Sequence, residues 1–246
     1  MLNQPHALFI SDLHLCAARP HTTALLLDFL QGPARDAQSL FILGDLFEYW
    51  AGDDDLEAHR DIVQALKALA GAGVRTCFMH GNRDFLIGEG FARASGTTLL
   101  QDPLTVTLFG WQAVLTHGDR LCTDDVDYQQ FRSMVRDPRW QADFLAQPLL
   151  VRKAQIAAMR ERSRSEQSLK PDDIMDVNPA AVEQLLRSCH YPALLIHGHT
   201  HRPGVHPLNI DGRHCVRHVL GDWDLSGSYL RVDADGCSSH RLPQPA

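Results

Sequence analysis

The chain has 246 residues, 44% of them hydrophobic, and a formal net charge of −7. This length predicts one domain, or one domain with a large insertion, and the apolar content is sufficient for a buried core. The acidic balance argues against general nucleic-acid binding, and no apolar run reaches the roughly 18 residues of a membrane span. The six cysteines are scattered and the N-terminal stretch lacks the features of a signal peptide, so we expect a cytoplasmic protein with reduced thiols.

The first third of the chain alternates short apolar runs with helical patterns. ALFIS (7–11), SLFIL (39–43) and VRTCFMH (74–80) are typical of buried strands that stop at polar residues. TTALLLDFLQG (22–32) and LEAHRDIVQALKALAGAG (56–73) are typical of helices that end at glycines. Alternation of strands and helices predicts an α/β core.

The remainder of the chain is mostly strand-like. TVTLFGWQAVLT (105–116) predicts a hairpin around Gly110, and ALLI (193–196) predicts a further buried strand. Four more strand-like runs follow His201: GVHPLNI, HCVRHVL, GSYLRVD and CSSHRL. The sequence therefore predicts two packed sheets with helices on the outside.

The stretch from Asp125 to Lys170 interrupts this rhythm. It is helical in pattern and rich in large apolar residues, and its part from Arg132 onward carries nine basic and four acidic residues. A basic block in an acidic protein predicts a local anionic partner, although a solvated helix face is the simpler alternative. We interpret the stretch as an insertion over the core.

Metal-ligand and polar residues follow five of the apolar runs. Side chains two apart on a strand share a face, so the pairs in SDLHL (11–15) and GHTH (198–201) can each point toward one metal; His197 has the same phase. Taken singly, Asp-x-His, GD and HGD are more typical of a turn or a cap than of a metal site, whereas GHTH is as typical of one as of the other. Together, at the carboxyl ends of strands where α/β proteins bind ligands, they predict a metal centre. Its candidate residues are Asp12, His14, Asp45, Asn82, His117, His199 and His201.

The series DLH, GD, GNRD, HGD and GHTH resembles the calcineurin-like metallophosphoesterase superfamily. Within it, SDLHL, ILGDLFEYW, HGNRDFL, HGDRLCTDD, IMDVN and IHGHTHRP resemble the branch of manganese-dependent pyrophosphatases that act on UDP-2,3-diacylglucosamine in lipid A biosynthesis. The resemblance implies an α/β (α+β) fold, a four-layer αββα sandwich forming one domain over residues 1–246. It also implies a helical cap inserted at residues 123–170.

The resemblance further implies two Mn²⁺ ions per chain that activate a hydroxide. One ion would take Asp12, His14, Asp45 and His201, and the other Asp45, Asn82, His117 and His199, so that Asp45 bridges. Mixed oxygen and nitrogen ligands suit Mn²⁺, although iron or zinc also fits them. Two metals roughly 3.5–4 Å apart can stabilise both oxygens of an in-line phosphoryl displacement.

Arg83 stands where many relatives have a histidine. A histidine can protonate a basic alkoxide, whereas a phosphate leaving group, whose second pKa is about 6, needs charge stabilisation instead. Arginine supplies a fixed cation with a planar fork that matches phosphate oxygens. We expect catalytic roles for Asp45, Asn82 and Arg83; the alternative is that Arg83 only pairs with Asp84 to hold the turn.

The resemblance also places the substrate. Its expected contacts are Asn82, Arg83 and His199 near the pyrophosphate, and Asp125, Tyr128, Arg160, Ser163, Gln167 and Lys170 in the cap. Gln167 departs from the pattern, since an asparagine is expected there, and both Tyr128 and Gln167 are open to reading as ordinary surface residues. We expect the apolar residues of the cap to divide between packing on the core and lining a slot for the acyl chains.

The expected reaction yields UMP and 2,3-diacylglucosamine 1-phosphate, catalysed by a monomer that contacts the cytoplasmic face of the inner membrane. Two alternatives remain: another dimetal phosphodiesterase or nucleotide pyrophosphatase with a soluble substrate, and a non-catalytic scaffold of the same fold. Three smaller expectations concern residues outside the ligand set. Asp53–Asp55 should cap the helix that follows them, His80 and His197 should be core or supporting residues, and Cys122 should be a packed apolar residue rather than a nucleophile.

Overall fold

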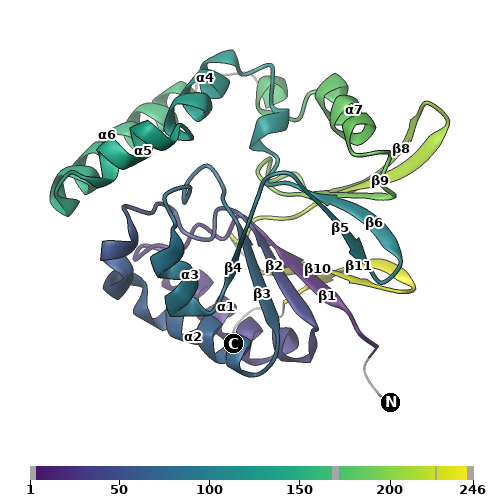
Figure 1. Ribbon diagram of the computed structural model, residues 1–246, viewed down its shortest axis with the longest axis horizontal. Coiled ribbons are helices and arrows are strands. Elements are labelled where there is room, and N and C mark those ends of the chain that lie inside the picture. The colour runs from purple at the N-terminus through teal and green to yellow at the C-terminus, as the bar shows by residue number, and fades with distance from the viewer. Residues whose placement is uncertain (1–3, 168–171, 225, 243–246) are drawn as a thin grey trace.

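The computed structural model describes residues 4–167, 172–224 and 226–242, which form two sheets packed face to face (Figure 1). The first sheet has the strand order β11 (Gly236–Arg241), β10 (Ser228–Asp233), β1 (Ala7–Ile10), β2 (Ser39–Leu43), β3 (Arg75–Met79) and β4 (Thr98–Leu100). The second has the order β5 (Leu104–Leu108), β6 (Trp111–Leu115), β7 (Leu194–His197), β9 (Arg213–Val219) and β8 (Gly204–Ile210). Strands β1 to β4 run parallel, as do β6, β7 and β9.

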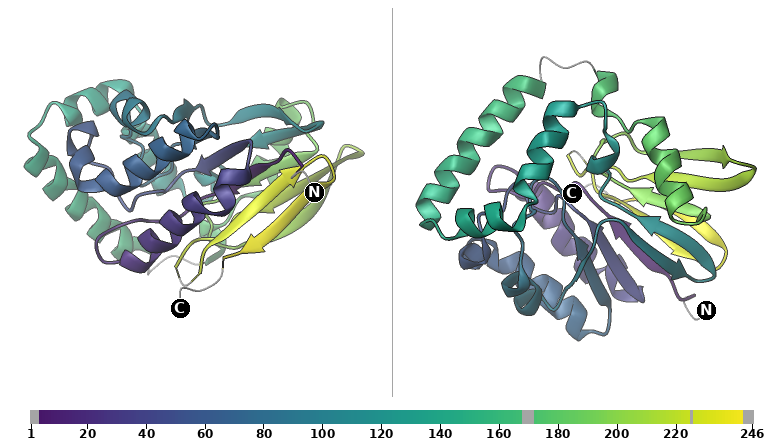
Figure 2. Two further views of the ribbon diagram at one scale, coloured as in Figure 1. Left: turned by 90° about the horizontal axis from the view of Figure 1, so that it is seen from below. Right: turned by 45° about the horizontal axis from the view of Figure 1, so that its top comes forward.

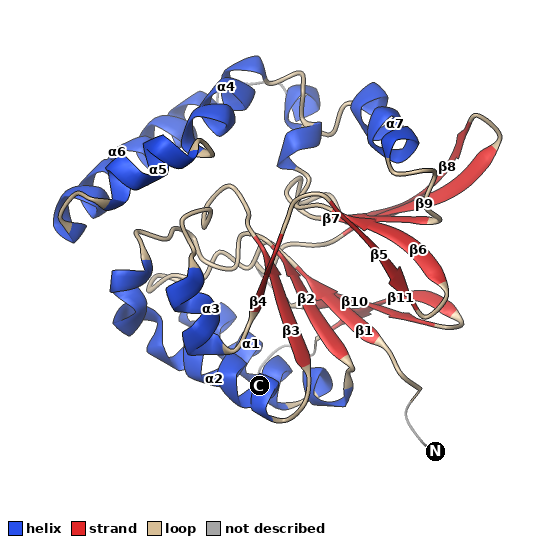
Figure 3. Cartoon of the chain, viewed as in Figure 1, coloured by secondary structure: helices blue, strands red, loops and turns tan. Residues whose placement is uncertain are grey.

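Helices cover the outer face of each sheet. On the first sheet lie α1 (Pro20–Gln31), α2 (Arg60–Gly71) and α3 (Glu89–Ser95), and on the second lies α7 (Pro179–Ser188) (Figure 3). This is the expected four-layer αββα sandwich. The expectation did not include α3, β4 or α7.

Alternation along each strand explains the layers. In β1, Leu8 and Ile10 join the core under α1 to α3, whereas Ala7 and Phe9 join the core between the sheets. Phe9 stacks on Phe41 of β2 with ring centroids 4.8 Å apart. Because both faces of these strands are buried, their sequences are continuous apolar runs rather than alternating ones.

The helical stretch between β6 and α7 consists of α4 (Val126–Val135), α5 (Pro138–Leu145) and α6 (Leu149–Gln167). Two views show these helices beyond the carboxyl ends of β1 to β3, on the opposite side of the molecule from β8 and β9 (Figures 1 and 2). Phe144 is part of the core under α1 to α3, and Trp140, Ile156 and Met159 pack against it. Leu150 is 82% exposed, and four other apolar side chains of this stretch are exposed as well: Val126, Met134, Leu145 and Val151.

The prediction that Asp53–Asp55 cap the following helix is wrong. These residues form a 3-10 helix, and α2 begins at Arg60 without a side-chain cap. Asp53 instead accepts hydrogen bonds from the backbone N–H groups of Gly88 and Phe91 at the start of α3. Asp54 and Asp55 pair with Arg152 and Lys153 of α6, so the three carboxylates fasten neighbouring elements. No helix in the described ranges is long and apolar enough to cross a membrane.

Candidate metal centre

The loops that follow β1, β2, β3, β6 and β7 meet at one edge of the two sheets. Backbone hydrogen bonds join them: Asp12 N–H donates to the Gly44 carbonyl (3.1 Å), His14 N–H to the Asp45 carbonyl (2.9 Å) and Gly198 N–H to the His117 carbonyl (2.9 Å). Left-handed backbone is costly for residues other than glycine and gathers at functional sites. Five of the seven predicted metal ligands adopt it: Asp12, His14, Asp45, His199 and His201, with φ between 51° and 69°.

Two glycines allow this close approach. Gly44 has φ +90°, and a Cβ atom there would lie 2.6 Å from both the Cα atom of Gly81 and Nδ1 of His117. A Cβ atom on Gly81 would lie 2.0 Å from Oδ1 of Asp45. Any other residue at these positions would push the loops after β2 and β3 apart. The glycines of the GD and GN motifs therefore have a steric role.

A first group of donors comprises Asp12, His14 and His201, whose ligand atoms lie within 4.8 Å of one another. Nε2 of His14 is 3.2 Å from Nε2 of His201, and the latter is 3.5 Å from Oδ1 of Asp12. Oδ1 of Asp12 is buried and makes no hydrogen bond within the described residues. Two imidazole nitrogens and a carboxylate oxygen thus point at a common position, as ligands of a metal do.

A second group comprises Asp45, Asn82, His117 and His199. Oδ1 of Asn82 lies 3.0 Å from Nε2 of His117 and 2.9 Å from Nδ1 of His199. Nδ1 of His117 is 2.8 Å from the Leu43 carbonyl, so it is the nitrogen that donates, and Nε2 is left facing the centre. The structure therefore brings all seven predicted ligands together.

Asp45 lies between the two groups. Its Oδ2 atom is 3.9 Å from Nε2 of His14 and 3.8 Å from Nε2 of His117. Burial lowers the pKa of His117, but the carboxylates of Asp45 and Asp119 raise it to about 9, so the centre strongly favours positive charge. Converging donors, a buried carboxylate oxygen with no hydrogen bond among the described residues, and this excess of negative charge fit divalent cations.

Arg83 adjoins the centre through its backbone, whose N–H donates to Oδ1 of Asp45 (2.8 Å). Its side-chain Nε is buried and makes no hydrogen bond within the described residues. Asp84 does not pair with it: the Asp84 carboxylate accepts backbone N–H groups, among them those of Leu46 (2.8 Å) and Gly81 (2.9 Å). Asp84 therefore holds the turn, which argues against the alternative that Arg83 serves only to do so.

Sequence reasoning did not single out Glu48. Its Oε2 lies 3.1 Å from Nδ1 of His14, while its Oε1 accepts a hydrogen bond from Arg160 of α6. A carboxylate at Nδ1 favours the tautomer that leaves Nε2 of His14 for the metal position. Burial raises the pKa of Glu48, but His14, Arg83 and Arg160 lower it to about 2, so the carboxylate is ionised. Glu48 lies in ILGDLFEYW, three residues after Asp45. Nothing in this motif distinguishes Glu48 as a residue that supports a metal ligand.

Asp119, also not singled out, ties α4 to the centre. Its side chain is fully buried, and Oδ2 accepts from the Tyr128 hydroxyl and from Nε of Arg132, both at 2.8 Å. Arg136 of α4 donates to the Gly81 carbonyl (2.8 Å). Burial raises the pKa of Asp119, but His117 and Arg132 hold it well below its usual range. The HGD motif thus contributes a ligand-type histidine and, two residues later, an anchor for the neighbouring helix.

The predicted substrate contacts at α4 and α6 differ in what their side chains contact. The Asp125 carboxylate accepts a hydrogen bond from the backbone N–H of Tyr128 and so caps α4. The Tyr128 ring stacks on the His199 ring, with the ring centroids 5.9 Å apart. Arg160 pairs with Glu48 and lies over the Tyr49 ring, and Ser163 is half-buried on α6. The side chain of Gln167 and all of Lys170 lie outside the described residues.

Three residues near the centre have other roles. Burial lowers the pKa of His197 to about 4, so its ring is neutral and Nε2 accepts from Arg217 at 3.2 Å. Nε2 of His80 is 2.7 Å from the Ile87 carbonyl. Burial raises the pKa of Cys122 to about 12, and its side chain belongs to the core under α7. The two histidines are supporting residues and Cys122 is an unreactive core thiol, as expected.

Comparison with known proteins agrees with this geometry. Residues 5–203 match the family model of calcineurin-like phosphoesterases. A protein of Aromatoleum aromaticum named UDP-2,3-diacylglucosamine hydrolase is 54% identical over 94% of each chain. A protein of the same name from Stenotrophomonas maltophilia is 50% identical, and one from Escherichia coli O81 is 51% identical. Each of these two matches covers 96% of this chain and 98% of the relative.

Proposed function

Because the chain belongs to the calcineurin-like phosphoesterase family, we propose that it hydrolyses the pyrophosphate bond of UDP-2,3-diacylglucosamine to UMP and 2,3-diacylglucosamine 1-phosphate. The substrate in this proposal rests on relatives about 50% identical over nearly the whole chain, which carry it in their names. The hydrolytic chemistry rests on one observation: the Asp45 carboxylate lies between two groups of metal-type donors.

We infer that the centre holds two divalent cations, with Mn²⁺ as the proposed metal. Asp12, His14 and His201 would hold one, Asn82, His117 and His199 the other, and Asp45 both. When bound, such a pair lowers the pKa of water and offsets negative charge on phosphoryl oxygens. Two sets of converging donors support two cations rather than one: Asp12 with His14 and His201, and Asp12 with Asp45 and His117. Oδ2 of Asp45 lies within 3.9 Å of a histidine nitrogen from each set. We propose that Asn82 and His199 also contact oxygens of the substrate.

Arg83 is the proposed substrate-binding and charge-stabilising residue. It is placed by its backbone hydrogen bond to Asp45, and Nε of its side chain is buried without a partner in the described part of the chain. A planar guanidinium can contact two phosphate oxygens at once and does not titrate near neutral pH. Arg83 would thus hold the pyrophosphate and stabilise the departing phosphate.

Residues 123–170 are the proposed cap over the substrate. Their helices lie beyond the strand ends that carry the donors, and Arg160, linked to His14 through Glu48, faces the centre. We propose that Asp125, Tyr128, Arg160, Ser163, Gln167 and Lys170 contact the glucosamine phosphate. The exposed apolar side chains at the α5–α6 turn, Leu145, Leu150 and Val151, suit contact with acyl chains or with the inner membrane.

The two alternatives are less well supported. A soluble nucleotide substrate would leave the exposed apolar residues of α4 to α6 without a role. A scaffold would have no need of seven converging donors, five of them on costly backbone conformations.

A mass-spectrometric assay of Mn²⁺-loaded protein tests the proposal. It compares UDP-2,3-diacylglucosamine with UDP-N-acetylglucosamine and bis(p-nitrophenyl) phosphate, with the Asp45→Asn variant as the control for contaminating activity. We expect the diacyl substrate to be cleaved fastest and UMP to appear in step with the lipid phosphate. Equal or faster cleavage of UDP-N-acetylglucosamine would support the soluble-substrate alternative, and no cleavage of any compound would support the scaffold.

A further inference from the structure

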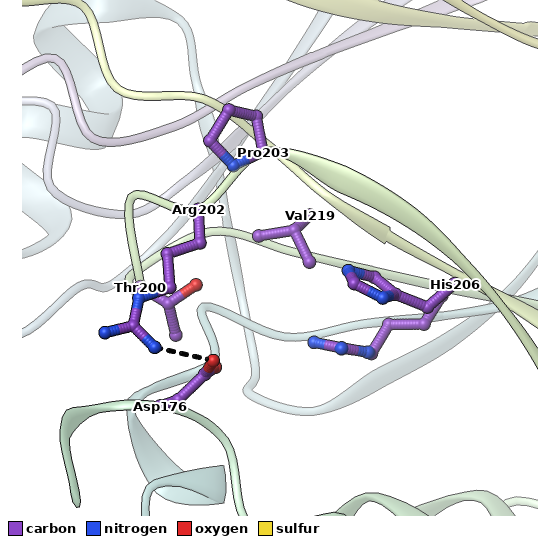
Figure 4. A pocket seen from close by; sticks show the side chains of 7 residues that line it. Asp176, Thr200, Arg202, Pro203, His206 and Val219 are labelled. Atoms are coloured by element: carbon purple, nitrogen blue, oxygen red, sulfur yellow. Dashed lines mark hydrogen bonds and ion pairs between the residues drawn. The ribbon is translucent and has the colours of Figure 1, made fainter. Parts of the chain in front are cut away.

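A cavity of about 320 Å³ lies beside the loop that carries His199 and His201. Figure 4 shows side chains from several segments around it: Thr200 and Arg202 from this loop, His206 from β8, and Asp176 from the turn before α7. Arg217 of β9 lines the cavity as well. Arg217 is two residues from Cys215, which packs under α7, so the cavity opens on the outer face of the second sheet.

Two motif residues that the metal centre leaves without a role, Asp176 and Arg202, meet in this cavity. Asp176 belongs to IMDVN and Arg202 to IHGHTHRP, and Nη1 of Arg202 donates to Oδ2 of Asp176 at 2.9 Å (Figure 4). The Asp176 side chain remains 36% exposed, so its carboxylate retains an open edge.

The position of Arg217 is fixed from the metal-centre side. Its Nη1 donates to Nε2 of His197 (3.2 Å), whose Nδ1 is 2.9 Å from the Gly198 carbonyl. His197 is fully buried at the end of β7, two residues before His199. Arg217 is therefore held by the segment that continues into the candidate ligands, and the cavity and the centre share one rigid support.

The lining combines donors and acceptors of hydrogen bonds. The guanidinium groups of Arg202 and Arg217 and the carboxylate of Asp176 line the cavity, and Oγ1 of Thr200 is buried without a hydrogen-bond partner in the part of the chain that is described. A buried hydroxyl without a partner indicates that a ligand or water completes it. The carboxylate disfavours a free phosphate here, whereas a ring that carries carbonyl acceptors on both sides of an N–H donor matches both kinds of group.

We propose that this cavity binds the uridine half of the substrate, through hydrogen bonds to the uracil ring. The inference rests on the proposed function, in which the pyrophosphate joins a lipid end to a nucleoside end. The α4–α6 helices, proposed for the lipid end, lie on the opposite side of the molecule from β8 and β9, which line this cavity (Figures 1 and 2). Pro203 and Val219 supply apolar surface for the ring beside these polar groups.

Calorimetric titration of Mn²⁺-loaded protein with UMP and with ribose 5-phosphate tests the proposal, because the two probes carry the same phosphate and differ in the base. We expect UMP to bind at least about tenfold more tightly, on the scale of one to two net hydrogen bonds. His206→Trp should fill the cavity mouth and Arg217→Gln should remove a donor, and each should reduce the preference for UMP to within about threefold. Val205→Trp is the matched control, since Val205 is 56% exposed on the opposite face of the same strand and should keep the preference.

Equal affinities of the unaltered protein for the two probes would overturn the proposal. So would a preference for UMP that survives in both variants, each verified to be folded by circular dichroism. If the proposed function fails but the cavity proposal holds, the protein should prefer UMP over ribose 5-phosphate and yet not cleave UDP-2,3-diacylglucosamine. Cleavage of that substrate without a preference for UMP would keep the function and reject only this cavity.

Discussion

At the scale of single residues, Arg83 is expected to stabilise the phosphate that leaves. Arg83→Ala should lower kcat/KM by about 10²–10³-fold, the usual loss for one strong electrostatic contact in a transition state. Arg83→Lys should recover part of this loss, because a point charge cannot contact two oxygens as a planar fork does. Steady-state kinetics and metal analysis of both variants measure this, with Arg93→Ala on the exposed side of α3 as the control.

Metal content should stay unchanged in both Arg83 variants, since no side-chain atom of Arg83 is proposed as a ligand. A near-normal rate for the alanine variant, or loss of metal from it, would count against the assigned role.

Glu48 should influence metal binding through His14. Its Oε2 lies 3.1 Å from Nδ1 of that histidine, and loss of such a supporting carboxylate typically weakens metal affinity by about 10–100-fold. We expect Glu48→Gln to show this loss in a competition titration with a metal chelator, with Glu89→Gln on the surface as the control. An unchanged affinity would mean that the contact with Glu48 does not orient His14.

The sequence allowed prediction of the metal-centre residues better than of their surroundings. The seven ligand-type residues could be found because each follows an apolar run, and the structure brings all seven to one place. The positive φ angles of Asp12, His14 and Asp45 could not be foreseen, because tertiary contacts between loops impose them. Glu48 was missed for a similar reason, because its partner Arg160 lies 112 residues away in the sequence. The partner of Asp119, Arg132, is 13 residues away but belongs to a different element, α4.

At the scale of elements, a buried ion pair attaches α4 to the loop after β6. The Asp119 side chain is fully buried, and Arg132 is 21% exposed. Arg132→Gln removes the closest cation, while the Tyr128 hydroxyl and Arg136 (3.9 Å) still face the carboxylate. The free energy of unfolding should therefore fall by about 1.5–3 kcal/mol, the usual contribution of a hydrogen bond to a charged group. Urea unfolding measures the change, and Arg139→Gln on the exposed face of α5 is the control.

A double variant tests whether the loss comes from the pair. Adding Asp119→Asn removes the carboxylate that Arg132 neutralised and should restore part of the stability lost in Arg132→Gln. Strictly additive losses would show that the two side chains act independently.

Element prediction succeeded where the local pattern was strong. The parallel strands β1, β2, β3 and β7 are continuous apolar runs because both of their faces are buried. The seven-residue helix α3 and the three-residue strand β4 are too short to show a periodicity. The Asp53–Asp55 cluster has the composition of a helix cap, but tertiary partners in α3 and α6 take its carboxylates instead.

At the scale of the whole molecule, the metal centre should contribute to stability, because its donors come from loops of both sheets. Metal at about 100 times its dissociation constant stabilises a fold by about 2.7 kcal/mol. For a chain of this size, that corresponds to a Tm increase of roughly 5–10 °C. Differential scanning calorimetry of metal-free protein, with and without added Mn²⁺, should show the increase, and a Tm that does not respond to Mn²⁺ would contradict it.

The most direct test of the account is a titration of metal-free protein with Mn²⁺ in which bound metal and hydrolysis of UDP-2,3-diacylglucosamine are followed together. Because Asp45 lies between two groups of donors, we predict that two Mn²⁺ ions bind per chain. We also predict that hydrolysis to UMP and 2,3-diacylglucosamine 1-phosphate reaches its full rate only as the second ion binds. Full activity in metal-free protein, or at a single bound ion per chain, would contradict hydrolysis at an Asp45-bridged pair of metals.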